Sequence, residues 1–207
     1  GWFAPTAGRS SNSLRAVLRD LMDAHTCDDY SEARVFMFNT LDVRGDGLVE
    51  CVYTGITDTP TGGTTAGVLN TEHSWPQSQG AGVHPARCDL HHLYPTENTA
   101  NSRRSNHPFG IVTDASWEGS GSKYGTDALG DSVFEPRDVH KGNVARSLIY
   151  FSTQYELPLD PAYLALLRDW SALDPVDATE LERTLTIADE QGAANAYVVC
   201  PHLVDAY

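Results

Sequence analysis

The sequence predicts an α+β protein in which a short strand–loop–strand–helix unit is surrounded by α-helices. Two observations predict this class. Apolar residues repeat at helical spacing near both ends of the chain, over residues 13–25 and from residue 144 onward. The middle of the chain instead carries short apolar runs separated by loops that contain Gly and Pro, as expected for strands. With 207 residues the chain is long enough for one hydrophobic core, so we expect a single domain over residues 1–207.

Five helices outside the central unit follow from periodicity and from capping residues. The first covers residues 13–25, and the second runs from Ser31, a good N-cap residue, to about Leu41. The C-terminal part is expected to be helical over residues 144–155, 161–173 and 177–191. A proline at the first position of the second of these, and Gly192 after the last, are typical helix boundaries.

Short strands are expected over residues 48–53, 68–71 and 90–94. A long loop joins the second of these strands to the third, and a helix from Thr96 to about Ser105 follows the third. Residues 114–131 are rich in Gly, Ser and Asp, which predicts an exposed segment.

The chain is strongly acidic, with 14 Lys and Arg against 28 Asp and Glu and a net charge of −14. This charge argues against a polyanionic partner, because affinity for nucleic acid comes largely from cationic contacts with phosphate. Residues 84–110 are an exception, since Arg87, Arg103 and Arg104 outnumber the acids there by one. A groove for an anion is therefore expected in the middle of the chain. No apolar stretch approaches the roughly 18 residues of a membrane span.

Four cysteines are scattered along the chain without a CxxC pair. This pattern is more typical of disulfides in an exported protein than of a zinc ribbon, and a cytosolic protein with four thiols is the alternative. Three pairings are possible. We expect a disulfide between Cys27 and Cys51, which are separated in the sequence by about one helix, and a second between Cys88 and Cys200, which would join the acidic C-terminal segment to the central strand–loop–strand–helix unit. The chain begins at Gly1 without a basic and apolar leader, as expected of mature or trimmed protein.

One group of residues in the middle of the chain has the pattern of a metal-dependent hydrolytic site. Glu72 and the side-chain carbonyl of Asn101 are hard oxygen ligands of the kind that Mg²⁺ prefers. His73 is largely neutral at pH 7–8 and can take a proton from water. Neighbours on a strand point to opposite faces, so the strand must end or bulge here for both to serve one site. Spacing alone leaves a surface acid–histidine pair and a solvated Asn as the commoner alternatives.

The stretch NTEHSWPQS at residues 70–78 resembles the Glu-His-x-Trp-Pro active-site motif of the bacterial endonuclease I family. Further similarities follow in the same order and cover most of the chain from about residue 30. They are DLHHLYPT at 89–96, NSRRSN at 101–106, PFG at 108–110, FEPR at 134–137, KGNVAR at 141–146, Trp170 and DPV at 174–176.

The resemblance implies a ββα-metal nuclease core, in an exported bacterial enzyme that cuts DNA, and often RNA, with little sequence preference. By position, Glu72 and Asn101 would hold one Mg²⁺, with Mn²⁺ or Ca²⁺ as substitutes in binding, and His73 would be the general base. Arg104 matches the family's arginine beside the metal-ligand helix and would brace a phosphate or the product; a salt bridge to a surplus acid is nearly as expected. The products would carry 5′-phosphate and 3′-hydroxyl ends.

We therefore expect a monomeric nuclease in the extracellular space or the periplasm. One departure from the family pattern lies near the C-terminal end, where Gln-Gly-Asn-Arg-Asn-Pro-Phe is typical. This chain reads QGAANAY at residues 191–197, so Ala194 replaces the arginine. Any contact that this arginine makes in the family is in doubt here.

Two other functional classes stay open from the sequence. A zinc hydrolase would draw its ligands from Cys88, His91, His92 and His73, although the chain has no His-Glu-x-x-His motif. A protein that binds nucleic acid or a surface without catalysis would explain Ala194, but not an intact Glu72, His73 and Asn101. Asp89 and His91 are expected either to support the site or to form a satisfied pair in the core.

Overall fold

The structure is a computed structural model that describes residues 11–207, and it has the expected α+β class. Its longer helices are α1 (Ser11–Met22), α2 (Tyr30–Phe36), α3 (Asn98–Arg104), α4 (Lys141–Gln154), α5 (Pro161–Leu173) and α6 (Ala178–Gln191). Two helical turns, α7 (Ala196–Val199) and α8 (Leu203–Ala206), end the chain, and a π-helix, η2 (Met37–Leu41), continues α2. Three 3-10 turns lie at η3 (Gln77–Gln79), η4 (Ala86–Cys88) and η5 (Asp138–His140).

Three small sheets accompany these helices. The strands are β1 (Val49–Glu50) with β2 (Thr57–Asp58), β3 (Leu69–His73) with β4 (Leu93–Glu97), and β5 (Asp114–Gly119) with β6 (Ser122–Thr126) and β7 (Ser132–Glu135). All pairs are antiparallel. No helix within residues 11–207 has the length and apolar character needed to cross a membrane.

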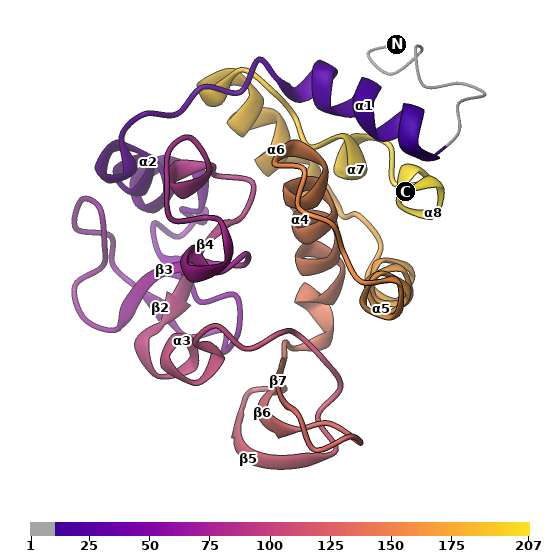
Figure 1. Ribbon diagram of the computed structural model, residues 1–207. Helices are drawn as coiled ribbons and strands as arrows, with labels where there is room; N and C mark the ends of the chain where they lie inside the picture. The colour runs from indigo at the N-terminus through magenta and orange to yellow at the C-terminus, as the bar shows by residue number, and fades with distance from the viewer. Residues whose placement is uncertain (1–10) are drawn as a thin grey trace.

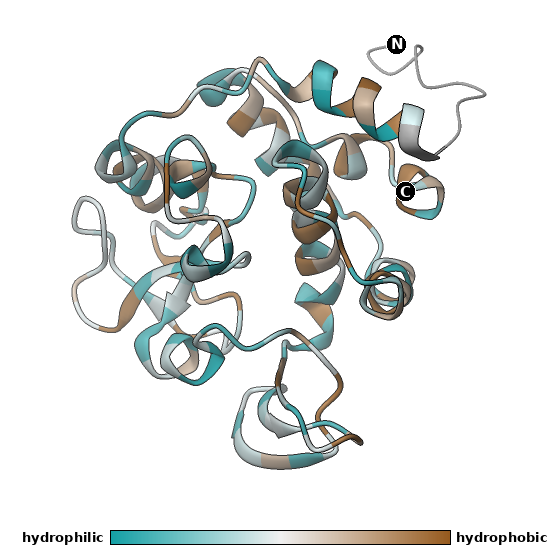
Figure 2. Cartoon of the chain, in the orientation of Figure 1, coloured by the Kyte–Doolittle hydropathy of each residue, from teal (hydrophilic) through white to brown (hydrophobic). Residues whose placement is uncertain are grey.

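Helix α4 forms the centre of the core. In Figure 1 it runs through the middle of the molecule, with α5 on one side and β3, β4 and α3 on the other. Twelve of its fourteen residues are buried, and its middle is coloured as apolar in Figure 2. A helix that buries nearly its whole circumference needs neighbours all round it. Helices α1, α5 and α7 supply part of that cover.

The predicted strand–loop–strand–helix unit is present as β3, β4 and α3. The two strands pair antiparallel from Leu69 opposite Glu97 to His73 opposite Leu93, without a bulge. Helix α3 follows β4 directly and packs on both strands. The loop between the strands is long enough to carry two 3-10 turns and a cis peptide bond before Pro85.

The helix predictions are confirmed at the level of elements, with shifted ends. Helix α5 has the predicted bounds, and α6 ends as expected at Gly192, whose φ of 92° lies in the left-handed region that glycine tolerates. Ser31 was the wrong N-cap for α2. The Asp29 side chain caps it instead, accepting hydrogen bonds from the backbone N–H groups of Ser31 at 2.6 Å and Glu32 at 3.1 Å.

The second core strand begins three residues later than predicted. The backbone N–H of Leu90 is bound by the Gln191 side chain at 2.9 Å, and that of His91 by the Asp89 carboxylate at 2.9 Å. Backbone donors that side chains already hold cannot join a sheet ladder, so residues 90–92 form a turn. The first predicted strand, residues 48–53, is likewise shortened to β1 because a turn follows it.

Residues 114–131 are mostly exposed or partly buried, as expected, and they also contain two strands. This segment forms most of the three-stranded sheet β5–β6–β7, which lies at one end of the molecule in Figure 1. Ser120 and Gly121 both have positive φ, 49° and 95°, and they connect β5 to β6 as a two-residue hairpin. Glycine tolerates the positive φ that such a two-residue turn requires.

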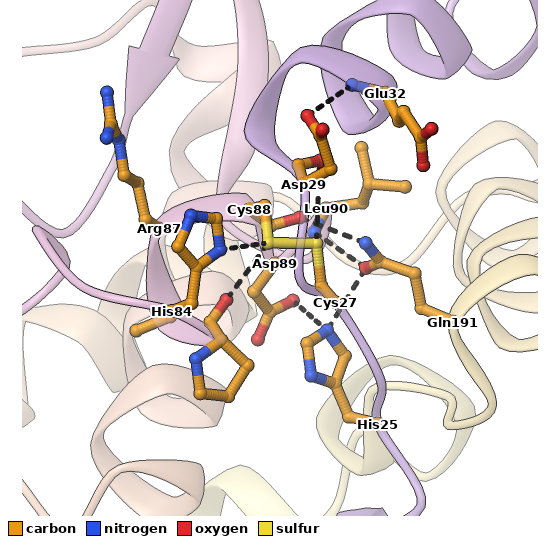
Figure 3. The surroundings of a disulfide bond; sticks show 12 residues. His25, Cys27, Asp29, Glu32, His84, Arg87, Cys88, Asp89, Leu90 and Gln191 are labelled. Atoms are coloured by element: carbon orange, nitrogen blue, oxygen red, sulfur yellow. Dashed lines mark hydrogen bonds and ion pairs between the residues drawn. A yellow bond between two sulfur atoms is a disulfide. The ribbon is translucent and has the colours of Figure 1, made fainter.

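Both predicted disulfide pairings were wrong, because Cys27 is bonded to Cys88, with their Cα atoms 5.9 Å apart. Figure 3 shows this disulfide beside His25, Asp89 and Gln191. Cys51 is instead a buried free thiol whose Sγ accepts hydrogen bonds from the backbone N–H groups of two residues, and Cys200 is free and partly buried. The segment after α1 therefore folds back on the loop between β3 and β4 rather than on β1.

Removing this disulfide is expected to lower stability substantially. It closes a loop with a sequence separation of 61, which corresponds to about 4 kcal/mol in the chain-entropy model. For a domain of this size that is a decrease in Tm of roughly 10 °C. The double variant Cys27→Ala/Cys88→Ala should show it in thermal unfolding, while Cys200→Ala serves as the matched control. Non-reducing peptide mapping that joins Cys51 or Cys200 to another cysteine would contradict this pairing.

Candidate active site

Glu72 and His73 lie at the last two positions of β3, where the strand ends. Both are nearly buried, with 2% and 7% of their surfaces exposed. Their contacts confirm that the two side chains leave the strand on opposite faces, as alternation requires. Glu72 contacts Tyr53 and Arg104, whereas His73 contacts the backbone of Arg87. It is the end of the strand, and not a bulge, that brings this pair to the edge of the sheet.

The Glu72 carboxylate is held by a phenol and a guanidinium. The Tyr53 hydroxyl donates a hydrogen bond to Oε1 at 2.9 Å, and Arg104 Nε lies 2.9 Å from the same oxygen in an ion pair without hydrogen-bond alignment. Burial raises the pKa of Glu72 to about 7, although Arg104, Tyr53 and the backbone N–H of His73 all act to lower it. The positive charge nearby thus only partly offsets the cost of burying this carboxylate.

Arg104 is buried, with 1% of its surface exposed, on the side of α3 that faces β3. Its Nη2 donates to the backbone carbonyl of Ser74 at 2.6 Å and its Nη1 to that of Ser105 at 3.0 Å. The guanidinium also stacks 4.4 Å from the Phe109 ring. Because Nη1 and Nη2 bind backbone carbonyls and the side chain is buried, the Arg104 guanidinium contacts the Glu72 carboxylate and is not presented to solvent. Of the two expectations for this residue, the salt bridge is the one present.

His73 is oriented by the loop that precedes β4. Its Nε2 lies 3.0 Å from the carbonyl oxygen of Arg87, and a carbonyl only accepts, so this nitrogen carries the proton. The lone pair is then on Nδ1, which lies 3.5 Å from the Gln77 side-chain amide. Burial lowers the pKa of His73 to about 3, and the charges of His92, Arg87 and Arg104 act in the same direction. The ring is therefore a neutral acceptor at physiological pH.

Asn101 lies on the same strand–helix interface as Glu72. Its Nδ2 donates to Asn70 Oδ1 at 2.7 Å and to the carbonyl of Thr71 at 3.2 Å. These two bonds fix the amide orientation, and its Oδ1 accepts no hydrogen bond from any of the described residues. Asn70 and Glu72 are two apart on β3, and Asn101 and Arg104 are three apart on α3, so each pair shares a face. Asn98, three residues before Asn101 on the same helix, is exposed.

The two histidines of the DLHHLYPT motif, His91 and His92, are buried and bind backbone carbonyls in the core. His91 Nε2 lies 2.8 Å from the carbonyl of Ala193, and His92 Nε2 lies 2.7 Å from that of Ala86. Asp89 accepts hydrogen bonds from the hydroxyl groups of Tyr150 and Tyr155 on α4 and just after it. Of the two expectations for Asp89 and His91, the satisfied core residue is the one that these contacts support.

The residues proposed as zinc ligands are not arranged to bind zinc in this structure. The Cys88 sulfur is bonded to Cys27 and is not a thiolate. Within residues 11–207, no group of three His, Cys, Asp or Glu side chains is arranged to hold a metal ion. A Mg²⁺ site built from one carboxylate and one amide needs fewer protein ligands than that, because water and phosphate complete its shell.

Several residues near the pair were not found from the sequence. Tyr53 precedes Glu72 by 19 positions, and the Tyr30 ring lies 5.3 Å from that of His73 across 43 positions. Arg34 donates from Nε to Thr71 Oγ1 at 3.1 Å. No local spacing connects these residues with the motif, because the fold brings them together over long separations.

Comparisons with known proteins identify the family of this chain. The model of the family Endonuclease I matches residues 10–202. An extracellular ribonuclease of Bacillus amyloliquefaciens is 30% identical over 99% of this chain and 76% of its own length. An extracellular ribonuclease of Bacillus subtilis (strain 168) is 29% identical over 99% and 77%. A periplasmic deoxyribonuclease of Aeromonas hydrophila is 30% identical over 53% of this chain and 46% of its own length. The chain belongs to the Endonuclease I family.

Proposed function

We propose that this protein is an exported, Mg²⁺-dependent nuclease that hydrolyses phosphodiester bonds in DNA and RNA with little sequence specificity. Membership of the Endonuclease I family and the nuclease names of its relatives support the reaction class. The relatives include both ribonucleases and deoxyribonucleases, which supports a broad choice of substrate. Their extracellular or periplasmic location, and the Cys27–Cys88 disulfide, support export.

The observation that carries the proposal is the arrangement at the end of β3, where the neutral imidazole of His73 directly follows Glu72 and where no described side chain donates to Glu72 Oε2 or Asn101 Oδ1. The contacts of Tyr53 and Arg104 are both made to Oε1 of Glu72, and no described side chain bonds to Oε2. The Asn101 amide nitrogen is engaged, so its oxygen remains for a ligand. Both atoms are hard oxygen ligands. The nearby Arg104 only partly offsets the cost of burying the negative charge of Glu72, so a divalent cation would stabilise this carboxylate further. We therefore assign Glu72 and Asn101 as the Mg²⁺ ligands.

In the proposed mechanism His73 Nδ1 takes a proton from the attacking water, because Nε2 is already bound to the Arg87 carbonyl. The water attacks phosphorus in line with the leaving 3′ oxygen, which takes a proton from solvent water, so the products carry 5′-phosphate and 3′-hydroxyl ends. When bound, Mg²⁺ supplies positive charge that polarises the phosphate and stabilises the leaving oxygen. Arg104 and Tyr53 position the Glu72 carboxylate for this task.

A plasmid assay tests the proposal. Supercoiled DNA and a structured RNA are incubated with the protein alone, with EDTA, and with added Mg²⁺, Mn²⁺, Ca²⁺ or Zn²⁺. Nicking and linearisation should require Mg²⁺ or Mn²⁺, stop with EDTA and give ends that a ligase accepts without kinase treatment. Absence of cleavage with Mg²⁺, or cleavage that persists in EDTA, would contradict the proposal.

The affinity for Mg²⁺ is expected to fall below about pH 7. The pKa of Glu72 is raised to about 7, so below that pH a proton must leave before the carboxylate binds a cation. The apparent dissociation constant should then rise by about tenfold for each pH unit below 7 and level off above it. His73, with a pKa near 3, stays neutral over this range. Calorimetric Mg²⁺ titrations between pH 5.5 and 8.5 check this, and a constant affinity would exclude Glu72 as the titrating ligand.

A further inference from the structure

Arg34 and Arg87 lie beside His73 without an acidic partner among the described residues. Seven other basic residues form ion pairs with carboxylates, namely Arg19, Arg44, Arg104, Arg137, Lys141, Arg146 and Arg183. The chain has 28 acidic and 14 basic residues, so carboxylates are plentiful as ion-pair partners for an arginine. Arg103, Lys123 and Arg168 also lack a carboxylate partner among the described residues, but Arg34 and Arg87 differ from these in lying against the aromatic ring next to the proposed base.

The two guanidinium groups share one aromatic ring. Arg87 lies 4.9 Å and Arg34 5.6 Å from the centre of the Tyr30 ring, which itself lies 5.3 Å from the His73 ring. Arg87 Nε is buried and has no hydrogen-bond partner. In Figure 3 the Arg87 side chain points away from the disulfide and from the Asp89 carboxylate beside it. Two like charges held against one ring repel each other, and an anion bound to both would offset that repulsion.

Arg34 is placed along β3 relative to the proposed base. Its Nε bonds to Thr71, which is two residues before His73 and so on the same face of the strand. Two residues of a strand span roughly 6.6 Å. This is comparable to the distance between neighbouring phosphates of one nucleic-acid strand. This spacing fits a phosphate at Arg34 that is the neighbour of one at His73 on the same strand.

We propose that Arg34 and Arg87, packed on Tyr30, bind the phosphate next to the one that is cleaved, on the same nucleic-acid strand. Arginine suits this role because its planar fork makes paired hydrogen bonds to phosphate oxygens, and stacking on Tyr30 orders the fork beforehand. A body with net charge −14 repels a polyanion at long range, so local contacts of this kind must supply the binding. The proposal rests on the nuclease function proposed above.

The experiment compares substrates with and without a neighbouring phosphate. The unflanked substrate is a thymidine dinucleotide with one phosphodiester, and the flanked ones carry an added terminal phosphate at the 5′ or the 3′ end. For one of these ends, the flanked substrate should have a kcat/KM about ten- to a hundredfold higher in the wild type. Arg34→Gln should lose most of this ratio, and Arg34→Lys should keep part of it. Arg19→Gln, which removes the same charge on α1, should keep the wild-type ratio.

A binding measurement separates this inference from the nuclease function. In a His73→Ala background, affinity for a single-stranded oligonucleotide is measured against salt. Arg34→Gln should reduce the slope of log affinity on log salt by about 0.7, the value for one lost phosphate contact. A wild type that cleaves, with ratio and slope unchanged in Arg34→Gln, would overturn the phosphate site alone. A wild type that cleaves nothing would overturn the nuclease function, and the slope would still decide whether Arg34 binds phosphate.

Discussion

Replacing His73 by alanine is expected to lower kcat for plasmid cleavage by about 10²–10⁴-fold while nucleic-acid binding survives. The reason is that His73 Nδ1 would act only in the chemical step, as acceptor of the proton from water. The hydrogen bond from its Nε2 to the Arg87 carbonyl orients the ring, and no substrate contact is assigned to this nitrogen. Single-turnover cleavage rates and oligonucleotide affinities, both at saturating Mg²⁺, separate the two effects.

Two controls accompany this variant. His202→Ala removes an exposed histidine near the C-terminus and should leave cleavage as in the wild type. Added imidazole should restore part of the activity of His73→Ala, because the lost side chain leaves space next to Gln77 and the Tyr30 ring. Cleavage by His73→Ala within a few-fold of the wild-type rate would remove this residue from the chemistry.

The helices could be predicted from the sequence because their information is local. Periodicity and caps over ten to fourteen residues are sufficient for α1, α5 and α6, and Asp160 caps α5 through two backbone N–H bonds. The start of β4 could not be predicted in this way. It depends on Gln191, which comes a hundred residues later and binds the N–H of Leu90. A distant side chain thus decides where the ladder begins.

The candidate site likewise contains residues that local motifs suggest and residues that only the fold brings near them. Glu72, His73 and Asn101 stand in continuous motifs, so the sequence suggested them, and their roles stay predictions until tested. The residues that orient them come from other elements, as Tyr53 does for Glu72 and the Arg87 carbonyl for His73. The disulfide was mispredicted for the same reason. The pairing followed sequence neighbourhood, whereas the return of the chain after α1 onto η4 places Cys27 at Cys88.

Replacing Glu72 by glutamine is expected to lower the cleavage rate by at least about a thousandfold and to weaken Mg²⁺ binding. The variant keeps the shape of the side chain and an oxygen that accepts from Tyr53, but it loses the charge that would hold the cation. A catalytic metal contributes several kcal/mol to transition-state stabilisation, which corresponds to rate factors of roughly this size. Cleavage at rising Mg²⁺ concentration and calorimetric titration give the two quantities.

Loss of stability must be separated from loss of the metal, because Glu72→Gln also leaves Arg104 buried without its carboxylate, at a cost of about 3–5 kcal/mol. Glu180→Gln is the matched control. It removes the carboxylate that binds the equally buried Arg146 on α4, where no metal is proposed. Both variants should unfold at lower temperature, but only Glu72→Gln should lose Mg²⁺ binding and cleavage. Equal Mg²⁺ affinity in the two variants would show that Glu72 holds Arg104 in the fold and does not bind the metal.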